Sequence, residues 1–472
     1  MSGVSEYIYF KSPVWMQQVA VSLYGWWWYR RRMSHHFYRL VAEYQSRDNW
    51  TREQFLAYQE NALLQLLQTA DCSQYYQAIF KEAKVNWQLN AFEILAGLPL
   101  LSKETLRTRA RDLLTQSPPP KSTAVFKSSG TTGTPTEIYY SPEFHALELA
   151  VPAARNLIWA GVSYYSRRVM FGVRKVCRFD QDKPPFWRFS LAEDMAYASI
   201  YHLSPKNIPA HLDFLRKYKP AMIMGYPSAL HTIAQYALEH NDKPAPAKAI
   251  FTTSETVTEL QRKTIENAWQ CKIYDRYGAV EGCMLAFQCE HGRYHVSPEV
   301  GIIEIINSNG QPCVLGEMGE VVCTGLQNLL QPLIRYRTGD VARWAMGQAC
   351  PCGRQMPILE AIEGRVEDIC ITSDGRQMLR FDTVFKGVEN IREAQVVQEQ
   401  LDLFTIRLVP ADTFEEHDIQ KIKDNMHLHA GEVRVDVHLV DQIERTASGK
   451  FRAVICKLSQ DEKDRVLNRV SG

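Results

Sequence analysis

A loop rich in hydroxyl groups and glycine follows a short apolar stretch near residue 125. Its members are Ser128, Ser129, Gly130, Thr131, Thr132, Gly133 and Thr134. Glycine lets the backbone approach a ligand closely, and backbone N–H groups together with hydroxyls donate hydrogen bonds to anions. We therefore predict that this loop holds phosphate oxygens, with a plain solvent-exposed turn as the alternative. It is not a Walker loop, because no Gly-Lys-Ser/Thr sequence follows it.

A second group of residues is suited to bind a metal ion. The stretches CEHGRYH (289–295) and ACPCGR (349–354) place three thiols and two imidazoles in loops. Cys289, His295, Cys350 and Cys352 would form a Cys₃His set, which is the tetrahedral ligand set that zinc prefers. His291 is the rival fourth ligand. With four protein ligands the zinc would be structural.

Four further motifs follow the first loop in a fixed order. They are YGAVEG (277–282), PLIRYRTGD (332–340), GRVED (364–368) and RTASGKFR (445–452). The order and spacing of the five resemble the adenylate-forming superfamily of acyl-CoA synthetases and adenylation domains, most closely its phenylacetate–CoA ligase-like branch. Within that branch, residues 183–205 and 381–398 are similar to the capsular-polysaccharide-associated subgroup. Related ligases of the branch carry a similar zinc cluster.

The resemblance implies a reaction and a role for each motif. A carboxylate would attack the α-phosphate of ATP to give acyl-AMP and pyrophosphate, so the protein mainly supplies position and positive potential. The catalytic residues would be Lys450, Glu281 and Arg365, with Glu281 as a ligand of the Mg²⁺ that accompanies ATP. The loop 128–134 would hold the β- and γ-phosphates. The nucleoside would be bound by Ser254, Glu255, Tyr277, Gly278, Asp340 and Arg365, with Asp340 accepting from the ribose hydroxyls.

The segments around the motifs indicate two domains. Short apolar strands alternate with helices up to about residue 364, which is typical of an α/β domain, here residues 1–365. One such helix is expected from Thr51, with Phe55, Leu56 and Leu63 on one face. Residues 366–472 read as a small α+β domain that carries Lys450. By resemblance this domain rotates during catalysis about a hinge at Glu367 and Asp368.

The identity of the acid and of the acceptor is left open by the sequence. Arg174, with Lys175 and Arg178, would favour a polar or anionic acid such as a uronic acid sugar if it faces the acid pocket, and is otherwise a surface charge. Tyr226 and His202 are further candidates for the pocket wall. Coenzyme A or an amine is the acceptor. The Gly-x-x-x-Pro pattern of aryl-CoA ligases is absent from residues 372–382.

Composition excludes several other classes of protein. The 472 residues carry a net charge of +1, which gives no global signal for nucleic acid or an anionic membrane. Eleven cysteines and the lack of a signal peptide predict a reducing, cytoplasmic location, with the cysteines outside the metal set as small buried residues.

The Trp-rich residues 19–32 are either an interfacial anchor or, as we favour, an amphipathic segment packed on the main body. No apolar stretch here reaches the roughly 18 residues that span a bilayer. Dimerisation is left open.

The leading hypothesis is therefore an ATP-dependent, AMP-forming carboxylate ligase acting in capsule or exopolysaccharide biosynthesis. An aryl-acid–CoA ligase of the phenylacetate type is one alternative, and a non-catalytic nucleotide-binding protein is another. A hydrolase is disfavoured because the chain has no Gly-x-Ser-x-Gly elbow.

Overall fold

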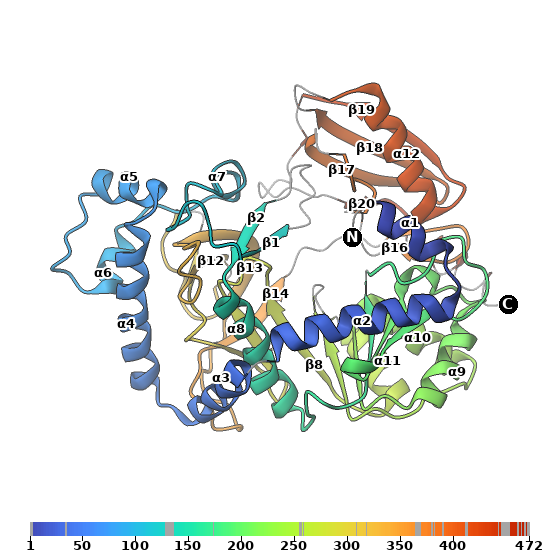
Figure 1. The fold of residues 1–472 in the computed structure, drawn as a ribbon, viewed down its shortest axis with the longest axis horizontal. Coiled ribbons are helices and arrows are strands. Elements are labelled where there is room, and N and C mark those ends of the chain that lie inside the picture. The colour runs from blue at the N-terminus through green and yellow to red at the C-terminus, as the bar shows by residue number, and fades with distance from the viewer. Residues whose placement is uncertain are drawn as a thin grey trace.

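The computed structural model describes most of the chain (Figure 1). The described residues are 3–33, 35–127, 136–172, 174–253, 257, 259–307, 309–317, 319–363, 370–378, 381, 383–388, 391–410, 414–441, 443–444, 454–459, 462–463, 465–466 and 469.

Seven helices occupy the N-terminal part of the described chain. They are α1 (Gly3–Lys11), α2 (Val14–Arg32), α3 (His35–Ser46), α4 (Arg52–Ala70), α5 (Gln74–Glu82), α6 (Ala91–Ala96) and α7 (Lys103–Thr108), with a short 3₁₀ turn η1 (Arg47–Asn49) before α4. Helix α4 begins where the sequence predicts it, because Thr51 and Gln54 form a reciprocal capping box. Phe55 and Leu63 are buried as expected, whereas Leu56 is 46% exposed, since it falls on the outer side of the helix.

A twelve-stranded sheet forms the centre of the large domain. Its order is β11-β12-β13-β14-β10-β9-β8-β7-β6-β3-β5-β4. The strands are β3 (Arg168–Gly172), β4 (Trp187–Ser190), β5 (Met195–Ser199), β6 (Met222–Gly225), β7 (Ala249–Thr252), β8 (Ile273–Gly278), β9 (Leu285–Gln288), β10 (Tyr294–Val296), β11 (Gly301–Ile306), β12 (Gly319–Gly325), β13 (Tyr336–Trp344) and β14 (Ile358–Glu363). Strands β5, β3, β6, β7 and β8 run parallel, and the rest pair antiparallel. Strand β8 therefore joins the two halves.

Helices cover both faces of the parallel half, as such sheets require. One core lies under α9 (Ile208–Tyr218), α10 (Pro227–Glu239) and α11 (Glu259–Trp269). Another core contains residues of α3, of α8 (Pro142–Pro152) and of the π-helical turn η2 (Ala153–Leu157). The antiparallel half packs instead against α4 to α6. The predicted α/β fold of the large domain is confirmed.

A two-stranded hairpin carries the hydroxyl-rich loop. Strand β1 (Ala124–Lys127) pairs antiparallel with β2 (Glu137–Tyr140), and Lys127 lies opposite Glu137. The loop 128–134 connects the two strands and lies outside the described residues. Its position in the chain is therefore the one predicted, directly after a short strand.

The C-terminal part forms a separate small α+β unit, as predicted. Its sheet has the order β19-β18-β17-β20, from β17 (Ile391–Gln400), β18 (Leu403–Pro410), β19 (Arg434–Leu439) and β20 (Val454–Cys456). Helix α12 (Glu416–Ala430) packs its apolar side on this sheet, and a two-stranded piece, β15 (Cys370–Ile371) with β16 (Gln377–Met378), adds to the unit. The boundary at residue 365 falls in 364–369, outside the described residues, and stays a prediction.

The expectation that the cysteines outside the metal set are small, separate buried residues was partly wrong. Cys283 and Cys323 are buried, but they form a disulfide instead of two separate thiols. The turn that carries Cys283 comes this close because two glycines face it: a Cβ at Gly301 would lie 1.9 Å from Cys283 O, and one at Gly325 would lie 3.0 Å from Cys283 Cα. Cys72 is exposed, since it lies in the turn after α4, and Cys271, Cys313 and Cys456 are only partly buried.

Candidate active site and metal centre

Part of the predicted site lies outside the described residues. This holds for Ser128, Ser129, Gly130, Thr131, Thr132, Gly133, Thr134, Ser254, Glu255, Arg365, Glu367, Asp368 and Lys450. Their roles stay predictions.

The ends of three parallel strands bring the nucleotide motifs to one edge of the sheet. Gly225 of β6 pairs with Thr252 of β7, which in turn pairs with Asp275 of β8. Tyr226 follows β6, residues 254–256 follow β7, and Tyr277 lies at the end of β8. Ligands of open α/β sheets bind at the carboxyl ends of such strands. The topology therefore supports a ligand site here.

The adenine and ribose candidates contact each other directly. The Tyr277 hydroxyl donates to Asp340 Oδ2 at 2.7 Å, although the two residues are 63 positions apart. The backbone N–H of Asp340 donates to Thr338 Oγ1 at 3.1 Å, which fixes the start of the Asp340 side chain. At Gly278, a Cβ would lie 2.7 Å from Leu285 Cδ2, so glycine keeps the end of β8 close to β9.

The candidate magnesium ligand, Glu281, is also held in place. Glu281 is buried, and its Oε1 accepts a hydrogen bond from the Tyr336 hydroxyl at 2.9 Å. One residue earlier, the carbonyl of Val280 accepts from the Tyr140 hydroxyl at 2.6 Å. Tyr140 belongs to β2, so the hairpin that carries loop 128–134 is bonded to the YGAVEG turn. Sequence reasoning missed Tyr336 and Tyr140, because the motifs assign no role to either tyrosine.

Two charged residues that sequence reasoning missed lie beneath this turn. Glu148 of α8 has a fully buried Oε1, and a Cβ at Gly282 would lie 3.2 Å from it. Burial raises the pKa of Glu148 to about 7, and the positive charge of Arg276 opposes that rise. Arg276, next to Tyr277 in β8, donates from Nε to Thr253 Oγ1 at 3.2 Å, and burial lowers its pKa. The sequence signal for Glu148 was a glutamate between Leu147 and Leu149 in an otherwise apolar helix.

The three residues assigned to the acid pocket occupy different environments. Tyr226 is buried directly after β6, at the N-cap position of α10, where its side chain makes no capping hydrogen bond. His202 is also buried; its Nδ1 lies 2.8 Å from Ser199 Oγ, its ring stacks on Phe186, and burial lowers its pKa to about 4. Arg174 is exposed and its guanidinium lies 4.5 Å above the Tyr197 ring.

The other two cations of that stretch pair with acids near the surface. Lys175 lies 3.8 Å from Glu6 of α1, and Arg178 forms an ion pair with Asp180. These partners agree with the alternative that the basic stretch is a set of surface charges.

The four predicted metal ligands come together in the structure. One ligand atom of each of Cys289, His295, Cys350 and Cys352 lies within 4.8 Å of the others. Cys352 Sγ is 3.3 Å from His295 Nε2, and Cys289 Sγ is 3.7 Å from Cys350 Sγ. This spacing and the soft donor set suit a tetrahedral zinc ion.

The surroundings of the cluster favour His295 over His291. The ring of His295 is fully buried, whereas the His291 side chain is exposed. The backbone N–H of His291 instead donates to Cys289 Sγ at 3.4 Å, a contact that stabilises a thiolate. The cluster ties β9 and β10 to the loop between β13 and β14.

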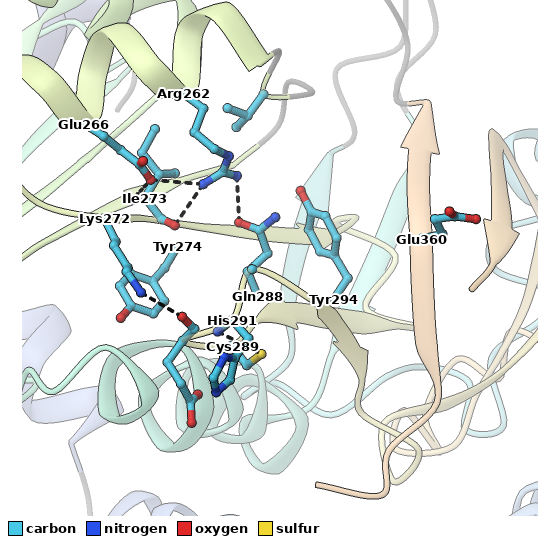
Figure 2. Close-up of a pocket in the computed structure, with 13 residues that line it drawn as sticks. Arg262, Glu266, Lys272, Ile273, Tyr274, Gln288, Cys289, His291, Tyr294 and Glu360 are labelled. Carbon is cyan, nitrogen blue, oxygen red and sulfur yellow. Dashed lines mark hydrogen bonds and ion pairs between the residues drawn. The ribbon is translucent and has the colours of Figure 1, made fainter. Parts of the chain in front are cut away.

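A polar cavity of about 610 Å³ borders the cluster (Figure 2). It lies at the start of β8, beside Lys272 and Ile273, and is thus at the opposite end of that strand from Tyr277. Arg262 of α11 donates to Gln288 Oε1 at 2.9 Å and to the carbonyl of Ile273 at 3.2 Å. Lys272 donates to the carbonyl of Glu290 at 3.0 Å. These groups satisfy one another, so the cavity has a structural explanation.

Comparisons with known proteins agree with this geometry. Residues 370–457 match the CapK C-terminal domain. Over 464 residues, 95% of this chain and 99% of the relative, the sequence is 24% identical to Protein CapK of Staphylococcus aureus. It is 26% identical to the phenylacetate-coenzyme A ligase of Thermus thermophilus over 68% of this chain and 72% of that one. The fold is that of a solved 2-hydroxyisobutyryl-CoA ligase in complex with 2-HIB-AMP and CoA, with a TM-score of 0.58, 22% identity and coverage of 90% of this chain and 94% of the other.

The chain is thus similar in sequence to the phenylacetate–CoA ligase-like branch of the adenylate-forming superfamily, and it has the fold of a solved adenylate-forming ligase. Its similarity to Protein CapK along nearly the whole chain, and to the CapK C-terminal domain, supports the resemblance seen at residues 183–205 and 381–398.

Proposed function

We propose that this protein is an AMP-forming carboxylate ligase, which activates an acid with ATP as an acyl-adenylate and transfers the acyl group to an acceptor. The observation that carries the proposal is the hydrogen bond between Tyr277 and Asp340, since it unites two nucleotide motifs from distant parts of the chain. The relatives named as coenzyme A ligases, together with the solved ligase that binds an acyl-AMP, support the same class of reaction.

The chain's own residues account for nucleotide binding as follows. The ring of Tyr277 offers a face to adenine, and the carboxylate of Asp340 accepts from the ribose hydroxyls. Loop 128–134 and Lys450 supply hydrogen-bond donors and positive charge to the phosphates. Magnesium bound beside Glu281 would neutralise charge on the phosphates, and the Tyr336 hydroxyl keeps that carboxylate oriented.

The zinc cluster has a structural role in this proposal. Cys289, His295, Cys350 and Cys352 supply four protein ligands, which leaves no open position for a substrate. Bound zinc would pin the loop between β13 and β14 to the strands that follow Tyr277. The motif that contains Asp340 lies on β13, so the metal would stabilise the nucleotide site indirectly.

The acid is proposed to be polar and connected with capsule or exopolysaccharide synthesis. Similarity to Protein CapK along nearly the whole chain supports this context. Glu148 and Arg276, close to the YGAVEG turn, are charges that an apolar aryl acid would not need. Coenzyme A and an amine are both retained as acceptors, and an aryl-acid–CoA ligase is the second candidate because of the phenylacetate–CoA ligase relatives.

Product analysis tests the proposal. The protein is incubated with ATP, Mg²⁺ and, in turn, uronic, aryl, fatty and amino acids, and nucleotides are separated by chromatography. We expect AMP and pyrophosphate with one acid class, and mass spectrometry then identifies a thioester with coenzyme A or a hydroxamate with hydroxylamine. ADP and phosphate as products, or acid-independent hydrolysis, would contradict an AMP-forming ligase.

A further inference from the structure

Helix α2 is fixed to the large domain by one of its sides. A Cβ at Gly25 would lie 2.0 Å from Ser190 Oγ, so the helix approaches the turn after β4 very closely. The Ser22 hydroxyl donates to the carbonyl of Phe189 at 3.2 Å and accepts from the N–H of Leu191 at 3.3 Å. Gln17 is buried and accepts from Arg188. The side of α2 that faces the protein is therefore defined.

The opposite side of α2 is apolar and exposed. Its large side chains are Trp15 (66% exposed), Val19 (50%), Leu23 (62%), Trp26 (50%) and Trp27 (48%). They recur every three or four positions, which places them on one face over about three turns. Tyr7 and Ile8 of α1 are also exposed, so the apolar surface continues onto the preceding helix. In Figure 1 both helices run along the front of the molecule.

The charge on α2 has a single sign. Its nineteen residues contain no aspartate or glutamate and end in Arg30, Arg31 and Arg32. Arg30 is exposed and lies 5.1 Å from the Trp26 ring, beside a hollow of about 540 Å³ that both share with Trp27. Arg32 is half-buried, with its guanidinium 4.0 Å from the centre of the Trp28 ring. Burial lowers the pKa of Arg32, and the negative charge of Glu193 opposes that change.

We propose that the outer face of α2 binds the surface of a membrane that contains anionic lipids. Tryptophan prefers the interfacial region of a bilayer, where its ring is buried and its N–H stays hydrated. Arginine beside the apolar face complements anionic headgroups. The helix lies along the surface, in keeping with the finding that no described helix is long and apolar enough to cross a membrane. The inference does not depend on the proposed reaction.

Vesicle flotation with the full chain tests this proposal. Wild-type protein should float with vesicles of equal parts phosphatidylethanolamine and phosphatidylglycerol, and much less with phosphatidylcholine alone. Leu23→Ser/Trp27→Ser should lower the partition coefficient by at least about tenfold, because binding scales with the apolar area inserted. Arg30→Glu should lower it by about tenfold or more on anionic vesicles, since it replaces an attracted charge with a repelled one.

A matched control separates this face from general stickiness. Val314 (71% exposed) and Met346 (69%) are comparably exposed but lie far along the chain from α2, and Val314→Ser/Met346→Ser should float like wild type. All variants change exposed side chains, so unchanged thermal unfolding checks that they fold. Failure of wild type to float with anionic vesicles would overturn the proposal. Equal loss in the control pair would overturn it too, as would a wild-type dimer that Leu23→Ser/Trp27→Ser dissociates without any vesicle binding.

Discussion

The hydrogen bond between Tyr277 and Asp340 predicts that removal of the Tyr277 hydroxyl weakens ATP recognition. Tyr277→Phe removes the hydroxyl 2.7 Å from Asp340 Oδ2 and keeps the aromatic ring that would stack on adenine. A hydrogen bond to a charged group contributes about 1.5–3 kcal/mol. Since 1.4 kcal/mol corresponds to tenfold, the Michaelis constant for ATP should rise by about 10- to 100-fold.

The assay is initial-rate ATP–pyrophosphate exchange as a function of ATP concentration, for wild type, Tyr277→Phe, Asp340→Asn and the double variant. Exchange with 3′-deoxy-ATP reports the ribose contact, and Asp340→Asn should lose the preference for ATP over this analogue. Tyr9→Phe is the matched control, because the Tyr9 hydroxyl also makes a hydrogen bond, to the carbonyl of Val176 at 2.8 Å, in another part of the protein.

Coupling between the two substitutions decides the outcome. If Tyr277 positions Asp340, the double variant should resemble Asp340→Asn alone, so the single effects should not add. Single effects that add to within about 0.5 kcal/mol would refute the positioning role. So would a Tyr277→Phe variant no weaker in ATP use than Tyr9→Phe.

Three further predictions test other parts of the structure. Metal analysis of purified protein should find one zinc per chain, which Cys352→Ser loses and His291→Ala retains; a zinc-free wild type would contradict the cluster. Arg155 and Glu299 form a fully buried bidentate ion pair. Arg155→Met should lower the unfolding free energy by about 3–5 kcal/mol in denaturant titration, and Arg155→Met/Glu299→Gln should recover part of that loss. A loss under about 1 kcal/mol in Arg155→Met would contradict the stabilising role of the ion pair. Burial raises the pKa of Glu148 to about 7, so between about pH 5 and 7 the folded protein keeps a proton on Glu148 that the unfolded chain has released. The unfolding free energy of wild type should therefore fall relative to that of Glu148→Gln as pH rises from about 5 to 8, by up to about 3 kcal/mol. A pH-independent difference would contradict that shift.

Local features of the fold could be predicted from the sequence. The start of α4 follows from the Thr51 cap, which needs only residues three positions away. The convergence of Cys289, His295, Cys350 and Cys352 could also be predicted, although Cys289 and Cys350 are distant in the chain. Three thiols and an imidazole in loops indicated a shared site, as did the resemblance to ligases that carry a similar cluster.

Features that depend on tertiary packing could not be predicted. The disulfide of Cys283 and Cys323 depends on Gly301 of β11 and Gly325 of β12, which leave room for the turn that carries Cys283. His202 has the same sequence signal whether it lines a pocket or packs on Phe186, as it does here. For the Trp-rich segment, the sequence predicted packing on the main body, which α2 confirms, but not which of its side chains stay outside.

The proposed function requires this chain to form an acyl-adenylate, with Lys450 as an essential residue. The test is ATP–pyrophosphate exchange measured across the acid panel, with Lys450→Ala beside Lys457→Ala, a lysine seven positions later in the chain that pairs with Glu399 at 2.7 Å. We expect exchange with one class of acid, abolished in Lys450→Ala and preserved in Lys457→Ala. Exchange that survives in Lys450→Ala, or its absence from the wild type with every acid, would contradict it.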